Sequence, residues 1–111
     1  MRIPWSLEEA VLLMDFYFKN GATLSIPNAE AERISNLLRI RAKKLNLSID
    51  STFRNVTGIK MQLGCIHSVV TNGKHGMPNA SKLFYDTYDL YHKNNVQFNR
   101  ILQQFYDKYI D

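Results

Sequence analysis

Between residues 9 and 19 the chain carries apolar side chains around almost the whole circumference of a helix. Ser6 and Glu9 have the spacing of a capping box that starts this helix. Asn20-Gly21 ends it, because glycine adopts the left-handed C-cap conformation easily. A helix that is apolar on nearly every side is stable only when other elements surround it. The sequence therefore predicts a central helix over residues 6–19, with the rest of the chain packed around it.

Helical spacing of apolar residues recurs in four later segments, at residues 29–44, 57–70, 80–93 and 96–110. Asn79 or Ser81 is the expected N-cap of the third of these segments. We find no strand pattern, and a chain of 111 residues is long enough to bury one core. The expected fold is all-α: a compact five-helix single domain over residues 1–111, with a tri-helical helix-turn-helix core over about 6–70 and C-terminal helices over about 80–110.

Residue types that carry catalysis or bind metals are few and scattered. His67, His75 and His92 lack metal-binding spacing, and Gly73-Lys74-His75-Gly76 lacks the spacing of a phosphate-binding loop. Cys65 is the single cysteine, and a small buried side chain is its commoner role. We therefore expect no enzymatic activity, no metal and no cofactor. The N-terminus has no apolar signal region and the longest apolar run is too short to span a membrane, so we expect a cytoplasmic protein.

Charge is distributed unevenly along the chain. Residues 33–82 hold nine basic side chains and one acidic side chain, Asp50, a balance of 9 − 1 = +8. The other 61 residues hold five basic and nine acidic side chains, a balance of −4. Such asymmetry predicts a positive field on one side of the protein that attracts phosphates. The alternative is a solvated basic face without a partner, and favourable placement at a helix C-terminus accounts for one or two of the charges.

The basic segment coincides with the expected helix-turn-helix. In that arrangement the third helix of the core enters the major groove of DNA. On a helical wheel, Lys60, Met61, Gly64, His67 and Ser68 fall opposite the apolar face of the helix over 57–70. We expect this opposite face to be exposed, with Gly64 marking either a close approach of another backbone or only a local weakness of the helix.

Two roles in DNA binding follow from this arrangement. Side chains of the expected recognition helix would reach base edges, namely Lys60, Gln62 and His67. Flanking basic side chains would hold phosphates, namely Arg39, Arg41, Lys43, Lys44 and Arg54. Replacing Lys60 or Arg54 by alanine is expected to weaken binding without loss of the fold.

The chain resembles a known family in three blocks. Trp5-Ser6 with Glu9, followed by an apolar helix, opens the match; Gly58-Ile59-Lys60-Met61-Gln62-Leu63-Gly64 and Asn79-Ala80-Ser81-Lys82-Leu83 continue it. These blocks resemble the N-terminal DNA-recognition domain of bacterial HNH-type (McrA-like) restriction endonucleases, some of which act on modified DNA. The opening also loosely resembles Myb/SANT three-helix domains.

The resemblance implies a double-stranded DNA-binding module of a restriction or defence system, which is bacterial and lacks catalytic activity of its own. An HNH nuclease domain or subunit is the implied partner. The chain departs from the family where Cys65 stands in place of a frequent Asn, where the following loop is shorter, and where no HNH motif follows. The predicted DNA-binding residues are Arg39, Arg41, Lys43, Lys44, Arg54, Asn55, Lys60, Gln62, Gly64, His67, Lys74, His75, Asn79, Ser81 and Lys82.

A second class of function stays open. Myb/SANT-like folds also bind peptides, and the two C-terminal helices are rich in aromatic residues that would serve as a dimer interface. In this alternative the chain is a protein–protein interaction or dimerisation module, for example a homodimer, without DNA binding.

Overall fold

A computed structural model of the protein describes residues 3–74 and 81–110. These residues form helices and no strand, which confirms the all-α fold class. The helices are α1 Leu7–Lys19, α2 Asn28–Lys44, α3 Val56–Val70, α4 Lys82–Lys93 and α5 Asn95–Tyr109. Each lies within two residues of its predicted bounds, although Asn79 and the predicted start of the fourth helix at residue 80 lie outside the described residues.

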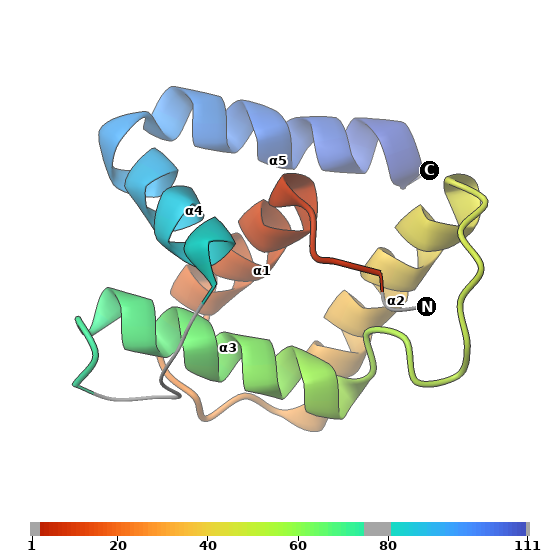
Figure 1. The fold of residues 1–111 in the computed structure, drawn as a ribbon, viewed down its shortest axis with the longest axis horizontal. Helices are drawn as coiled ribbons and strands as arrows, with labels where there is room; N and C mark the ends of the chain where they lie inside the picture. Colours follow the sequence, from red (N-terminus) through yellow and green to blue (C-terminus); the bar gives the residue numbers. More distant parts are fainter. Residues whose placement is uncertain (1–2, 75–80, 111) are drawn as a thin grey trace.

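The centre of the fold is α1, as its sequence predicts. Figure 1 shows α1 between α5 on one side and α3 on the other, with α4 and α2 towards the two ends. The run Ala10–Met14 and the aromatic residues Phe16 and Tyr17 are all at most 3% exposed. Apolar side chains from each of the other helices close around this run, which makes α1 the axis of the core.

The helix ends use the signals present in the sequence. The Ser6 Oγ accepts a hydrogen bond from the Glu9 backbone N–H at 3.4 Å, and the Ser6 backbone N–H donates to Glu9 Oε1 at 3.0 Å, so the predicted capping box is confirmed. Gly21 has a φ of +82°, which only glycine adopts without strain. Asn94 ends α4 and caps α5, accepting from the Gln97 N–H at 3.2 Å.

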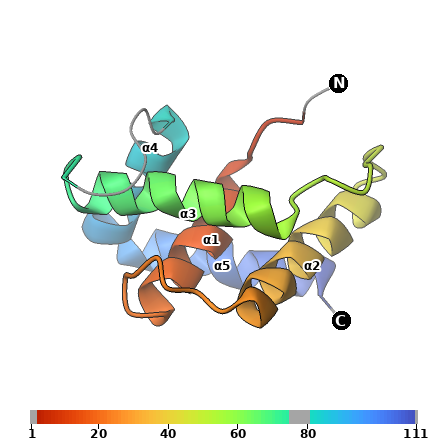
Figure 2. The same cartoon turned by 90° about the horizontal axis from the view of Figure 1, so that it is seen from below.

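The connection between α2 and α3 differs from a helix-turn-helix. Residues 45–55 join the two helices, whereas the turn of that motif has about 3–4 residues. Figure 2 shows this long connection leaving the end of α2 before the chain enters α3. The packing of α3 on both α1 and α2 is observed, but the tight turn is absent from this segment, so the tri-helical helix-turn-helix core is not confirmed.

Side chains of α2 hold this connection in place. Arg39 donates from Nη1 to the Phe53 carbonyl at 2.6 Å and from Nη2 to the Asp50 carbonyl at 3.1 Å. Ser35 Oγ donates to the Arg54 carbonyl at 2.6 Å. These bonds satisfy backbone acceptors that a loop would otherwise leave to water, and they fix the position of the start of α3.

Candidate nucleic-acid interface

Two of the arginines predicted to bind phosphates lie inside the protein. Arg54 Nε donates to Glu9 Oε2 at 2.8 Å, and the side chains of Arg54 and Glu9 are 8% and 0% exposed. Arg41 Nε donates to Glu8 Oε1 at 2.6 Å, with the Arg41 side chain 11% exposed. The prediction that Arg41 and Arg54 face a phosphate backbone is therefore wrong for this structure, because both guanidinium groups already neutralise carboxylates of α1.

Arg54 is also stacked between two aromatic rings. Its guanidinium lies 4.3 Å from the Trp5 ring centroid and 4.4 Å from that of Phe53. Its Nη atoms donate to the carbonyls of Ile3 and Pro4 at 3.2–3.4 Å. The Arg54 backbone has a φ of +49°, a left-handed conformation that non-glycine residues seldom adopt. Arg54 thus ties the N-terminal segment, α1 and the α2–α3 connection together.

The carboxylate of Glu8 extends this ion-pair cluster to the last helix. Tyr109 at the end of α5 donates its hydroxyl to Glu8 Oε1 at 2.7 Å, and Lys108 lies 3.7 Å from Oε2. Burial alone would raise the pKa of Glu8, but the hydrogen bonds of Tyr109 and Arg41 and the charges of Arg41 and Lys108 outweigh it, so this pKa lies below its ordinary value.

Because the pKa of Glu8 is lowered, the free energy of unfolding depends on pH in the acidic range. A carboxyl whose folded-state pKa is depressed stabilises the fold above its ordinary pKa of 4.5, and that stabilisation is lost as the pH falls through the folded-state pKa. We expect the free energy of unfolding to fall from about pH 5 towards about pH 3, and Glu8→Gln to flatten part of this fall. Urea denaturation at each pH measures it. Asp107→Asn, on the exposed face of α5, is the control; identical curves for Glu8→Gln and wild type would contradict the prediction.

The apolar stripe of α3 is buried as predicted, but its opposite face is not free along its whole length. Ile59, Leu63 and Ile66 are at most 1% exposed. Gly64 and Ser68, expected on the exposed side, are buried as well. The cause is that α3 packs against α4 in addition to α1 and α2, so it needs two buried faces.

His67 is also turned inwards. Its Nδ1 lies 2.5 Å from the hydroxyl of Tyr17, which in turn lies 3.2 Å from the Ala22 carbonyl oxygen. The two rings meet edge to face, with centroids 5.8 Å apart. The prediction that Gly64 lies on the exposed side of α3 is therefore wrong, and His67, which is half-buried, takes part in the packing of α3 on α1.

The exposed part of α3 is confined to its first half. Thr57, Lys60 and Met61 are exposed, and Gln62 is half-buried. Asn55 is the N-cap, and its Oδ1 accepts from the Gly58 N–H at 2.8 Å. Lys60 Nζ donates to Asn28 Oδ1 at the start of α2. The N-terminal half of α3 is thus the only part of this helix whose polar side chains reach the surface together, among the residues that the structure describes.

Several of the remaining basic residues keep their charge available. Within residues 3–74 and 81–110, Arg39, Lys43, Lys60 and Lys74 have no carboxylate within salt-bridge distance. Lys43 and Lys44 are exposed at the end of α2, and Lys74 is exposed just beyond α3. Figure 2 shows α3 lying across one face of the molecule, with α2 meeting its start. These four cations belong to α2, α3 and the residues next to them; Arg100 on α5 also has no carboxylate partner among the described residues and donates to Gln97 instead.

Other residues predicted to bind DNA are less favourably placed for contact with a phosphate. Lys82 pairs with Asp86 at 2.7 Å on the exposed side of α4. Ser81 is exposed and precedes that helix. His75 and Asn79 lie outside the described residues. Cys65 is half-buried, and burial raises the pKa of its thiol, which favours a packing role over a nucleophilic one.

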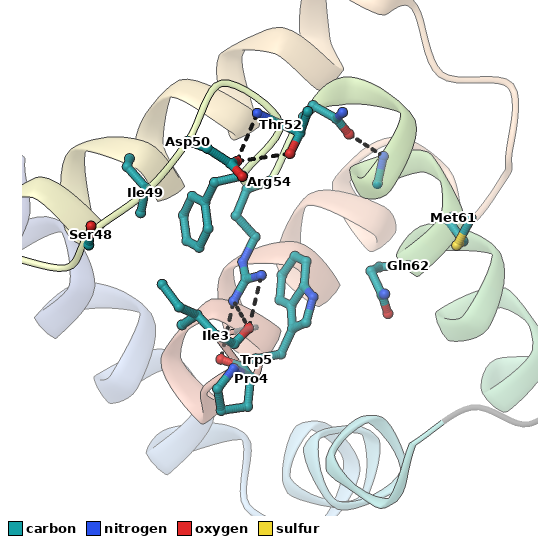
Figure 3. Close-up of a pocket in the computed structure, with 13 residues that line it drawn as sticks. Ile3, Pro4, Trp5, Ser48, Ile49, Asp50, Thr52, Arg54, Met61 and Gln62 are labelled. Carbon is teal, nitrogen blue, oxygen red and sulfur yellow. Dashed lines mark hydrogen bonds between the residues drawn. The ribbon is translucent and has the colours of Figure 1, made fainter. Parts of the chain in front are cut away.

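A cleft lies beside the exposed half of α3. Its volume is about 570 Å³, and three segments line it. They are the N-terminal residues 3–5, the connection between α2 and α3, and the face of α3 that carries Gly58, Met61 and Gln62. Figure 3 shows Trp5 between Arg54 on one side and Gln62 of α3 on the other. Sequence reasoning missed this cleft, because its walls come from segments about 50 residues apart, which Arg54 links by hydrogen bonds.

Comparisons of the chain with protein-family models, with curated proteins and with solved structures find no match. The resemblance to the recognition domain of HNH endonucleases therefore stays a prediction.

In the described residues, no group of three or more His, Cys, Asp or Glu side chains has the arrangement of a metal site. No described helix combines the length and the apolar character that a membrane span requires.

Proposed function

We propose that the protein binds double-stranded DNA with the exposed surface of α2, the α2–α3 connection and α3. The observation that carries this proposal is the set of cations on and around α2 and α3 without carboxylate partners among the described residues, Arg39, Lys43, Lys60 and Lys74. Cations that the protein itself does not neutralise are the ones that attract the phosphates of DNA.

The dimensions of α3 also support DNA binding by this helix. An α-helix about 10–12 Å across fits a major groove about 12 Å wide, and recognition helices contact base edges mainly with their N-terminal residues. The N-terminal half of α3 is where Thr57, Lys60 and Met61 are exposed. Lys60 would contact a phosphate or base at this end, with Lys43 and Lys74 on flanking phosphates. Arg39 would add to the positive electrostatic potential of this surface, while its hydrogen bonds hold the α2–α3 connection in place.

The roles of the arginines differ from those predicted from sequence. Arg41 and Arg54 hold the fold through Glu8 and Glu9, so they support the interface from inside. We also propose that the protein acts in a restriction or defence system with an HNH nuclease as its partner. This part of the proposal rests on the family resemblance alone.

Salt dependence tests the proposal. Contacts of Lys43, Lys60 and Lys74 with phosphates predict a slope of log K against log salt of about −2.7, from about −0.9 per contact. Raising salt from about 50 to about 200 mM should then weaken binding about 40-fold. Fluorescence anisotropy with a labelled duplex measures this slope. Undetectable binding at low salt, or an affinity that does not change with salt concentration, would contradict the proposal.

The dimerisation alternative receives no comparable support. Apart from Tyr85 on α4 and Val96 on α5, the exposed residues of these two helices are polar: Lys82, Asp86, Asp89, His92, Lys93, Asn95, Asn99, Arg100, Gln103, Gln104, Asp107 and Lys108. An obligate dimer interface would present an apolar face instead. Size-exclusion chromatography with light scattering separates the two functions: a dimer that ignores duplex DNA would favour the interaction module, and a monomer that binds it favours our proposal.

A further inference from the structure

The cleft beside α3 offers a planar ligand a surface to stack on. One side of the Trp5 ring is covered by the Arg54 guanidinium at 4.3 Å, and Figure 3 shows the ring between that guanidinium and Gln62 of α3. Trp5 is half-buried and lines the cleft, and its ring also packs against Phe84 of α4 with the two centroids 6.3 Å apart. The volume of about 570 Å³ falls in the range of about 300–1,000 Å³ typical of small-ligand sites.

Amide groups stand at the edge of this space. Gln62 lines the cleft, and its side chain makes no hydrogen bond to any described residue. Asn55 lines it too and uses only Oδ1 for the Gly58 N–H. Side-chain amides that offer both a donor and an acceptor are the groups that pair with the edges of nucleobases, adenine above all.

The charges of the cleft exclude a phosphate from its interior. Arg54 is the one cation among the lining residues, and Glu9 and the carbonyls of Ile3 and Pro4 occupy its donors. Asp50, a carboxylate, also lines the cleft. A neutral ring with hydrogen-bonding edges suits these walls, while the phosphates that carry the ring would lie outside the cleft.

Position links the cleft to the proposed DNA-binding face. Asn55, Gly58 and Gln62 are spaced by three and four residues, so they lie on one face of α3. Met61 belongs both to the lining of the cleft and to the exposed arc that includes Thr57 and Lys60. A strand bound at Thr57 and Met61 would therefore pass the mouth of the cleft.

We infer that the cleft accepts one unpaired, unstacked nucleobase of the bound DNA, stacked on Trp5 and hydrogen-bonded by the amide of Gln62. This inference rests on the proposed DNA binding and names the feature of DNA that the same face recognises. A base that is already unpaired enters most easily, since it need not be separated from a partner. Stacking on an aromatic side chain then adds to the affinity of the bound strand.

The test compares two labelled duplexes at one salt concentration, one fully paired and one with a single bulged adenine. We expect the bulged duplex to bind about tenfold more tightly, because one stacked base contributes on this scale. Trp5 is the only tryptophan of the chain, so its fluorescence should change saturably with the bulged duplex. Gln62→Ala should lower the ratio of the two affinities about threefold, because one hydrogen bond is lost while the stacking on Trp5 remains.

Gln104→Ala is the matched control, a glutamine exposed on α5, and should keep the tenfold ratio. Equal affinity of the wild type for both duplexes, or a ratio that is still tenfold in Gln62→Ala, would overturn the inference while leaving DNA binding intact. A wild type that binds neither duplex at low salt would overturn the proposed function and the inference with it.

Discussion

Replacing Arg54 by alanine should destabilise the fold by about 3–5 kcal/mol, the range for removing one partner of a buried ion pair. The variant would leave the carboxylate of Glu9, which is 0% exposed, without its nearest guanidinium. It would also remove the group that stacks on Trp5 and Phe53 and bonds the N-terminal carbonyls. Urea denaturation followed by circular dichroism measures the loss, and on a small domain it approaches the whole stability.

Arg33→Ala provides the control for this experiment. Arg33 pairs with Glu30 at 3.3 Å on the surface, with side chains 54% and 45% exposed, and such pairs contribute little to stability. We expect a change within about 0.5 kcal/mol. If Arg54→Ala were as stable as Arg33→Ala but bound DNA more weakly, Arg54 would be a phosphate contact after all, and the internal cluster would be incidental.

Removing Lys43 and Lys60 together should weaken duplex binding about 50-fold at about 100 mM salt and reduce the salt slope by about 1.8. The reason is that each lysine is exposed and lacks a carboxylate partner among the described residues, so its charge is available to a phosphate. Stability should stay close to wild type, since surface substitutions of this kind have small effects. Anisotropy titrations at several salt concentrations measure both quantities.

The matched control removes the same net charge elsewhere. Lys19 and Lys93 are exposed on α1 and α4 and pair with Asp15 and Asp89 one turn earlier. The double variant Lys19→Ala/Lys93→Ala should lose no more than about threefold in affinity, through the weaker overall field alone. If both double variants lost affinity equally, binding would reflect net charge, and the face around α2 and α3 would have no special part in it.

Much of the fold was predictable because it depends on local patterns. The Ser6–Glu9 capping box, the apolar circumference of α1 and the stripe Ile59, Leu63 and Ile66 are all read within one or two helical turns. The structure confirms each of them. The buried state of Gly64 was not predictable in this way, because it depends on α4 packing against α3, a contact that one helical wheel does not contain.

The candidate site was predictable only in outline. A count of charges over residues 33–82 treats every arginine and lysine as equally open to solvent. The structure separates Arg41 and Arg54, which pair with carboxylates of α1, from Lys43 and Lys60, which remain exposed. The cleft could not be predicted from the sequence for a similar reason, since the segments that line it are distant in sequence and meet only in the folded chain.

By itself the sequence determined that this chain forms helices, where most of them begin and end, and that α1 lies at the centre, because caps and apolar spacing act between residues a few positions apart. Only the tertiary structure decided which charges face outwards. Glu9 illustrates the reason: its position in the sequence marks a helix cap, yet burial in the core requires a partner for its charge, and Arg54, 45 residues later, provides it.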